Sequence, residues 1–255
     1  MKYLTKSLLC AATAALCLTS ATFAGQTVLS DNFSTAIGQD PHLNVIDFQN
    51  GSFIQGSGPD WSVTSGSGQL TIGLTPLGAT ELSPSNFNNG PHAITGPIAS
   101  GDFIGKVDMD ISHGDQMAAQ FFIDTPTTYF GIDFSPWGIH VSDGLGFSVF
   151  TPPPSATSGT FELVRSGDEI TALYEATGAS QFTTLADVSD PGLSGSTGFD
   201  LTAFLNKSSS PYAYPNSVSF SNYSVVSTVP DAGATLSMVG GAFAALAALR
   251  RRFAK

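Results

Sequence analysis

Apolar and polar residues alternate with a period of two along the middle of this chain. The clearest run is Phe103–Ile111, in which every second residue is apolar or glycine and most of the others are polar. Similar alternation returns in the segments 70–74, 130–134, 137–141, 170–176 and 218–220, with clusters rich in Gly, Pro, Ser and Asn between them. Strands of this kind bury one face, and two such sheets stack. We therefore predict an all-β fold, an antiparallel two-sheet β-sandwich.

The charges are distributed unevenly along the 255 residues. Between Gly25 and Val229 three basic residues face 19 acidic ones, a net charge of −16, whereas both ends of the chain are positive. Such an acidic region repels phosphate backbones, which excludes nucleic acid as a partner. A hydrophobic content of 42%, with 19 Phe, is enough for a folded core and argues against disorder. We expect one β-sandwich ectodomain at residues 25–228.

Residues 1–24 have the features of a secretory signal peptide that signal peptidase removes. Lys2 and Lys6 precede an 11-residue apolar run, Leu8–Leu18, and small residues follow it. The run is shorter than the ~20 residues that span a membrane, which disfavours a retained transmembrane helix. Both cysteines, Cys10 and Cys17, lie in this segment, so we expect a mature chain without thiols or disulfides.

Residues 229–255 contain three features in a fixed order: the short motif Val229-Pro230-Asp231-Ala232-Gly233, a mostly apolar segment, Leu236–Leu249, and the cluster Arg250-Arg251-Arg252. The order resembles the PEP-CTERM class of exosortase sorting signals, and the nearest form is its Val-Pro-Asp-Ser-Gly variant. Ala232 stands where that variant has serine. The resemblance implies that an exosortase recognises Val229–Gly233 and processes the chain there, which makes this protein a substrate of that enzyme.

The physical properties of this tail agree with the resemblance. As a helix, Leu236–Leu249 would span about 21 Å, less than the ~30 Å hydrocarbon core, so we expect a short and marginal transmembrane helix. Arg250 to Arg252 act as the membrane stop and stay cytoplasmic, which places the acidic domain outside. We expect transient residence in the inner membrane of a Gram-negative-type bacterium, then release to the cell surface or extracellular matrix. An ordinary tail anchor or a buried helix is the alternative.

A second resemblance concerns the ectodomain. Phe161–Val188 resembles the late strands of concanavalin A-like, laminin-G-type jelly rolls, and Asp31-Asn32-Phe33-Ser34 matches the usual opening of such domains. In this class a last strand of the type Val218–Val225 pairs with the first strand. The resemblance therefore implies a concanavalin A-like jelly roll.

Jelly rolls of this type include glycoside hydrolases that use Glu-x-Asp-x-x-Glu on one strand, and the nearest segment found here is Asp108–His113. Asp110 matches the middle residue, but Asp108 and His113 replace both glutamates. Retaining chemistry needs two carboxyls about 5–5.5 Å apart. We therefore predict that the chain is not an enzyme. Asp102, Asp108 and Asp110 could instead bind Ca²⁺, with a solvated polar face as the alternative and no other cofactor expected.

The four histidines, His42, His92, His113 and His140, have no metal-ligand spacing, and no serine has an evident histidine–acid pair beside it. His140 is expected on an outward face. Aromatic side chains in loops could stack on sugar rings, which makes Trp61, Tyr212 and Tyr214 candidate carbohydrate contacts. Trp61 could equally fill the end of the core, and Trp137 is expected in the core.

Together these features predict an exported, non-enzymatic protein of the cell surface or extracellular matrix, with a surface polysaccharide as a candidate ligand. The alternative is a secreted carbohydrate-binding module or a degenerate glycoside hydrolase of the concanavalin A-like class.

Overall fold

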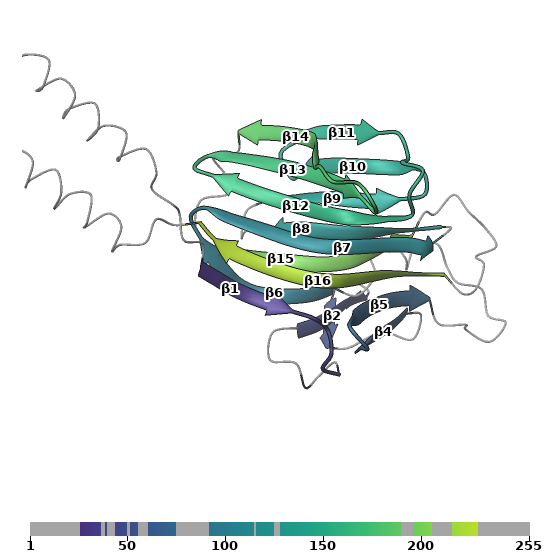
Figure 1. Ribbon diagram of the computed structural model, residues 1–255. Coiled ribbons are helices and arrows are strands. Elements are labelled where there is room, and N and C mark those ends of the chain that lie inside the picture. Colours follow the sequence, from purple (N-terminus) through teal and green to yellow (C-terminus); the bar gives the residue numbers. More distant parts are fainter. Residues whose placement is uncertain are drawn as a thin grey trace, which may run out of the picture. The chain divides into compact units, whose positions relative to one another are not determined.

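Strands account for every regular element in the described part of the chain (Figure 1). The structure, a computed structural model, describes residues 26–36, 39, 44–49, 52–55, 61–74, 92–114, 116–124, 128–189, 196–205 and 216–228. The predicted signal peptide, the sorting tail and Tyr212 and Tyr214 lie outside these ranges. No helix within them is long and apolar enough to cross a membrane.

The strands form two antiparallel sheets, which agrees with the predicted sandwich. Sheet 1 has the order β14-β13-β12-β7-β16-β5-β4, and β1 also pairs with β16. Its strands are β1 (Gln26–Asp31), β4 (Trp61–Gly66), β5 (Gln69–Leu74), β7 (Phe103–His113), β12 (Ser158–Ser166), β13 (Glu169–Ala176), β14 (Thr183–Ser189) and β16 (Ser217–Ser227).

Sheet 2 has the order β11-β10-β9-β8-β15-β6-β2-β3. Its strands are β2 (Asn44–Gln49), β3 (Ser52–Gln55), β6 (His92–Ser100), β8 (Met117–Asp124), β9 (Tyr129–Ser135), β10 (Gly138–Asp143), β11 (Ser148–Thr151) and β15 (Ser196–Leu205). Residues Thr27–Ser227 form one compact unit. Within it β7 and β16 of sheet 1 lie against β8 of sheet 2, so the sheets stack face to face.

The predicted strand face of β7 is confirmed. Phe103, Gly105, Val107, Met109 and Ile111 are buried, and the four residues that alternate with them are partly exposed. The hairpin of β12 and β13 turns at Gly167-Asp168, and the last strand pairs with the first, as the resemblance implies. These pairings match the order expected from the jelly-roll resemblance.

One cluster of four aromatic rings joins the two sheets. Phe103 and Tyr223 come from β7 and β16 of sheet 1, and Phe121 and Phe199 come from β8 and β15 of sheet 2; all four are fully buried. The Phe199 ring lies 5.2 Å from Phe103, 5.9 Å from Phe121 and 6.4 Å from Tyr223, measured between centroids. Gly105 leaves room for this ring, because a Cβ there would approach Phe199 Cε1 to 2.5 Å.

Truncating the ring at the centre of this cluster should destabilise the domain strongly. Phe199→Ala removes contacts to both sheets and leaves a cavity, so we expect a loss of about 3–5 kcal/mol in the free energy of unfolding. Urea denaturation followed by tryptophan fluorescence measures it. Leu145→Ala is the control, since Leu145 is 64% exposed and surface changes stay within about 0.5 kcal/mol. Equal losses in both variants would contradict this account of the core.

Candidate functional site

A groove of about 580 Å³ lies on the outer face of sheet 2. Side chains of β8, β9, β10, β11 and β15 and of the β9–β10 turn line it. Its polar residues are Gln120, Asp124, Asp133, Ser135, His140, Ser142 and Asp200, and its apolar ones are Ala118, Phe122, Tyr129, Trp137, Phe150 and Phe204. Among the residues that the structure describes, no Lys or Arg belongs to this lining. The groove is therefore both aromatic and acidic.

The strand register sets a polar row across the groove. Gln120 of β8 lies beside Asp133 of β9, which lies beside His140 of β10, followed by Phe150 of β11. Gln120 Nε2 donates to Asp133 Oδ1 at 2.6 Å, and His140 Nδ1 donates to Asp133 Oδ2 at 3.1 Å. The other imidazole nitrogen, His140 Nε2, lies 2.7 Å from Ser148 Oγ. The result is a continuous hydrogen-bonded chain over four strands.

Two groups in this row, the His140 imidazole and the Gln120 amide, are affected strongly by their surroundings. The hydrogen bond that His140 donates to Asp133 raises the pKa of His140 above its ordinary value of 6.5; partial burial opposes the rise, and the charge of Asp133 adds to it. Gln120 is 6% exposed, and its buried Oε1 has no hydrogen-bond partner among the described residues. An unpaired buried acceptor is costly, so this atom favours a ligand that brings a donor.

Aromatic rings form the walls of the groove. The Phe122 and Tyr129 rings meet edge to face at 5.7 Å, and Tyr129 and Phe150 are 41% and 56% exposed. Phe122 lies over Gly131, where a Cβ would approach its ring to 1.6 Å. The prediction that Trp137 fills the core is wrong: Trp137 is partly exposed and lines the groove, because it lies in a turn where strand alternation does not apply.

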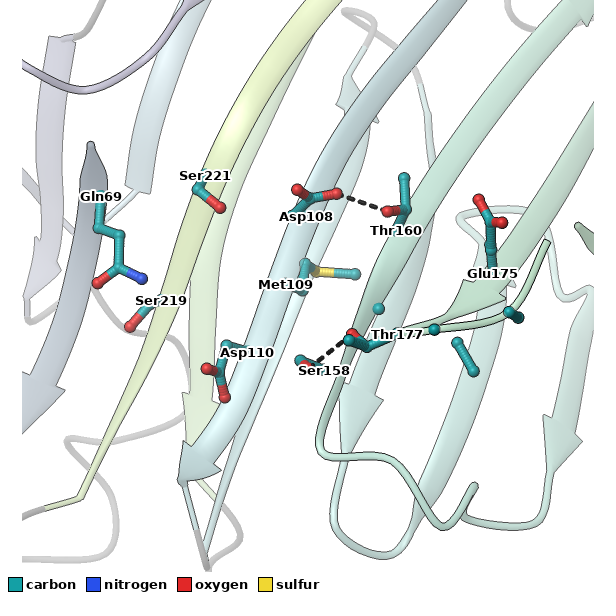
Figure 2. A pocket seen from close by; sticks show the side chains of 14 residues that line it. Gln69, Asp108, Met109, Asp110, Ser158, Thr160, Glu175, Thr177, Ser219 and Ser221 are labelled. Carbon is teal, nitrogen blue, oxygen red and sulfur yellow. Dashed lines mark hydrogen bonds between the residues drawn. The ribbon is translucent and has the colours of Figure 1, made fainter. Parts of the chain in front are cut away.

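Sheet 1 has a second hollow, of about 400 Å³, on its own outer face (Figure 2). Asp108 and Asp110 project from β7 into it, between β12 and β16. Asp108 accepts hydrogen bonds from the Thr160 hydroxyl and from Asn222 Nδ2, both at 2.6 Å, and Asp110 accepts from the Ser112 N–H at 2.7 Å. These carboxylates are already bonded within the protein.

The residues predicted for calcium do not come together as one cluster. Asp102 lies at the start of β7 and accepts a hydrogen bond from the Gly167 N–H at 2.7 Å, away from the hollow that Asp108 and Asp110 share. Among the described residues, no group of three or more His, Cys, Asp or Glu could hold a metal ion. Calcium binding at these positions stays a prediction without geometric support.

Of the predicted carbohydrate contacts, Trp61 begins β4 of sheet 1 and does not line the groove. Tyr212 and Tyr214 lie outside the described residues. His140 faces outward as expected. The prediction that no serine has a histidine–acid pair beside it is wrong, because His140 lies between Ser148 and Asp133. The sequence does contain a signal for this pair. The polar positions of the alternating segments 130–134 and 138–141 place Asp133 and His140 on the same outer face.

Comparisons with known proteins support both the sorting tail and the fold. Residues 228–253 match the family model described as the VPDSG-CTERM motif, in agreement with the predicted sorting domain. No curated protein sequence matches the chain.

Solved structures similar to the chain include a glycosyl hydrolase family protein from Mycobacterium fortuitum, at 14% identity and a TM-score of 0.54, covering 78% of this chain and 99% of that one. SCLam, a non-specific endo-β-1,3(4)-glucanase from family GH16, has 13% identity and a TM-score of 0.54 over 80% and 91% of the two chains. The CBM2 module of the Lactobacillus casei BL23 phage J-1 evolved Dit has 12% identity and a TM-score of 0.50 over 79% and 95%. These likenesses show a concanavalin A-like jelly roll.

The prediction that the chain is not an enzyme is contradicted by this comparison, because glycoside hydrolases share its fold. The segment on which that prediction rested also lies away from the groove. The segment compared with the hydrolase motif, Asp108–His113, lies on β7 of sheet 1, whereas the groove with aromatic walls lies on sheet 2.

The Asp133–His140 pair predicts a specific pH dependence. Because the folded-state pKa of His140 is raised, the pair stabilises the fold fully below about pH 6.5, and this contribution is lost as the pH rises through the folded pKa. Asp133→Asn should therefore lower the His140 pKa and destabilise the protein more near pH ~5.5 than near pH ~9. NMR titration and denaturation at both pH values test this, with His113→Gln as the control. A His140 pKa at or below 6.5 in the unmodified protein would contradict it.

Proposed function

We propose that this chain is an exported protein that binds a polysaccharide in the groove on the outer face of sheet 2. The observation that supports this most is the combination in one groove of exposed aromatic rings with a buried, unpaired acceptor, Gln120 Oε1. Sugar rings have an apolar face that stacks on aromatic side chains and hydroxyl groups that donate hydrogen bonds. The stacking contacts would come from Trp137, Tyr129 and Phe150. The hydrogen bond from a sugar hydroxyl would be accepted by Gln120.

The charge of the groove limits the class of polysaccharide that it can bind. The described lining has carboxyls from Asp124, Asp133 and Asp200 and neither Lys nor Arg, so an anionic polysaccharide would be repelled. A neutral glycan fits better. The similar folds of a β-1,3(4)-glucanase and of a module described as CBM2 make a neutral β-glucan the first ligand to test.

Export rests on the C-terminal motif. The match at residues 228–253 indicates a protein that a sorting enzyme processes at a membrane. We infer that signal peptidase removes residues 1–24, that an exosortase acts near Val229–Gly233, and that the domain is released to the cell surface or extracellular matrix. Lipid insertion of 236–249 with Arg250–Arg252 on the cytoplasmic side would hold the chain for that step.

Hydrolysis of the bound glycan is a second candidate function. It is favoured by the shared fold of glucanases and by three carboxyl residues on one groove. Of the pattern Glu-x-Asp-x-x-Glu, the segment Gly131–Pro136 keeps only the middle residue, Asp133. An acid–base pair would therefore have to include Asp124 or Asp200, since this chemistry needs two carboxyl groups.

Binding should depend on the groove tryptophan. Trp137→Ala removes an aromatic anchor, so we expect affinity for a soluble β-glucan to fall about tenfold, or ~1.4 kcal/mol. Isothermal titration calorimetry measures the binding, and new reducing ends in the same mixtures report hydrolysis. Phe182→Ala is the matched control, because Phe182 lies against Lys106 on sheet 1. Unchanged affinity in Trp137→Ala would reject this groove as the binding site.

Localisation should depend on the sorting tail. Deleting Val229–Lys255 removes the motif, the apolar segment and the arginines while leaving β16 complete, so we expect a folded domain in the wrong compartment. Cell fractionation with surface proteolysis measures this against the full-length protein. Normal amounts of the truncated protein at the surface would refute the sorting role.

A further inference from the structure

We propose that Ser148, His140 and Asp133 form a hydrolytic site for acyl esters at the β11 end of the groove. Ser148 Oγ lies 2.7 Å from His140 Nε2, and His140 Nδ1 lies 3.1 Å from Asp133 Oδ2. Nucleophile, base and orienting acid are thus joined in the order that acyl transfer requires. The three residues come from three neighbouring strands, β11, β10 and β9.

The hydrogen bonds determine which imidazole nitrogen acts as the base. An ionised carboxylate only accepts hydrogen bonds, so the proton of neutral His140 is on Nδ1, facing Asp133. Nε2 is then the acceptor, and the Ser148 hydroxyl donates to it. Gln120 Nε2 fixes Asp133 from the other side at 2.6 Å. Imidazole orientation therefore does not depend on a bound ligand.

The turn before Ser148 is held in place by a separate set of bonds. Asp143 is 8% exposed, and its Oδ1 accepts from the Leu145 N–H at 2.9 Å and from the Phe147 N–H at 2.7 Å. The Asp143 N–H also donates to the Phe147 carbonyl at 3.2 Å. These contacts order the hairpin that leads into β11, so Ser148 is presented from a defined backbone.

Access and a donor for the developing oxyanion are both available at this edge. Ser148 is exposed, and β11 is the last strand of sheet 2 among the described strands. Since Asp143 and Phe147 form a hydrogen-bonded pair, the next pair, Ser142 and Ser148, is of the non-bonded kind. The N–H of Ser148 therefore points away from β10, where it could stabilise an oxyanion on the attacked carbonyl.

A purely structural role explains this arrangement poorly. His140 and Asp133 side chains are 36% and 23% exposed, and Ser148 is exposed, so the bond between His140 and Ser148 adds little to the stability of the fold. A serine held at the base nitrogen of an acid-oriented histidine is instead the arrangement that nucleophilic catalysis needs.

The reaction balances with water as the only co-reactant. Ser148 Oγ bonds to the acyl carbon while its proton moves to His140 Nε2; the bond from the acyl carbon to the alcohol oxygen breaks, and His140 protonates that oxygen. Water then attacks the acyl-serine, passes a proton to His140, and the serine oxygen leaves and regains it. The products are an alcohol and a carboxylic acid. The assignment of the substrate rests on the proposed function, in which the groove binds a neutral polysaccharide. The alcohol is then a sugar hydroxyl, and the substrate class is an O-acylated neutral polysaccharide.

A small ester separates this activity from glycan binding. The full-length protein should hydrolyse p-nitrophenyl acetate and should be labelled at Ser148 by a fluorophosphonate, as located by peptide mass spectrometry. Ser148→Ala and His140→Ala should each lower the rate at least about 100-fold, and Ser180→Ala, at an exposed serine outside the groove, should not. Asp133→Asn should lower kcat with little change in KM, because it disturbs the base and not ester binding.

Chemically O-acetylated β-glucan then tests the substrate class, with acetate release as the readout. Circular dichroism and urea denaturation check that each variant is folded, and binding of unmodified β-glucan is measured separately. Absence of the Ser148 adduct, or equal rates for Ser148→Ala and the unmodified protein, would overturn the proposal even if β-glucan binds. Ester hydrolysis without any glycan binding would sustain the Ser148 site and reject the proposed ligand class.

Discussion

Burial of aromatic rings between the two sheets determines the rest of this structure. Phe121 and Phe199 of sheet 2 must face inward to meet Phe103 and Tyr223 of sheet 1. Because strand side chains alternate, the inward position of Phe121 directs its neighbour Gln120 to the outer face. The same alternation on β9 and β10 turns Asp133 and His140 outward. The packing of the core therefore sets the composition of the groove.

Asp133 connects the two properties of that groove. One of its carboxylate oxygens holds Gln120, whose other side-chain atom is left for a ligand, and the second holds His140, which in turn meets Ser148. A single carboxylate thus orients both the proposed binding group, Gln120, and the proposed acid–base group, His140. Asp108 of sheet 1 holds no such functional pair, because its two carboxylate oxygens accept hydrogen bonds from Thr160 and Asn222.

The sequence was sufficient for the strands, the sandwich and the C-terminal signal, because strand periodicity and a linear sorting motif are local patterns. Phe103–Ile111 and Ile170–Ala176 show this directly. It was insufficient for the site, because which outer face is hollowed depends on the register of strands far apart in the chain. Asp108 and Asp133 have the same alternating surroundings, yet they lie on different sheets. Trp137 was wrongly expected in the core because it lies in a turn, where side chains do not alternate between two faces as they do in a strand.

We propose that the outer face of sheet 2, and not that of sheet 1, binds the polysaccharide. A crystal structure of the protein with a bound β-glucan oligosaccharide would locate the binding surface. We expect sugar rings against Trp137 and a sugar hydroxyl donating to Gln120 Oε1. An oligosaccharide bound instead beside Asp108 and Asp110 in the hollow of sheet 1 would contradict the account.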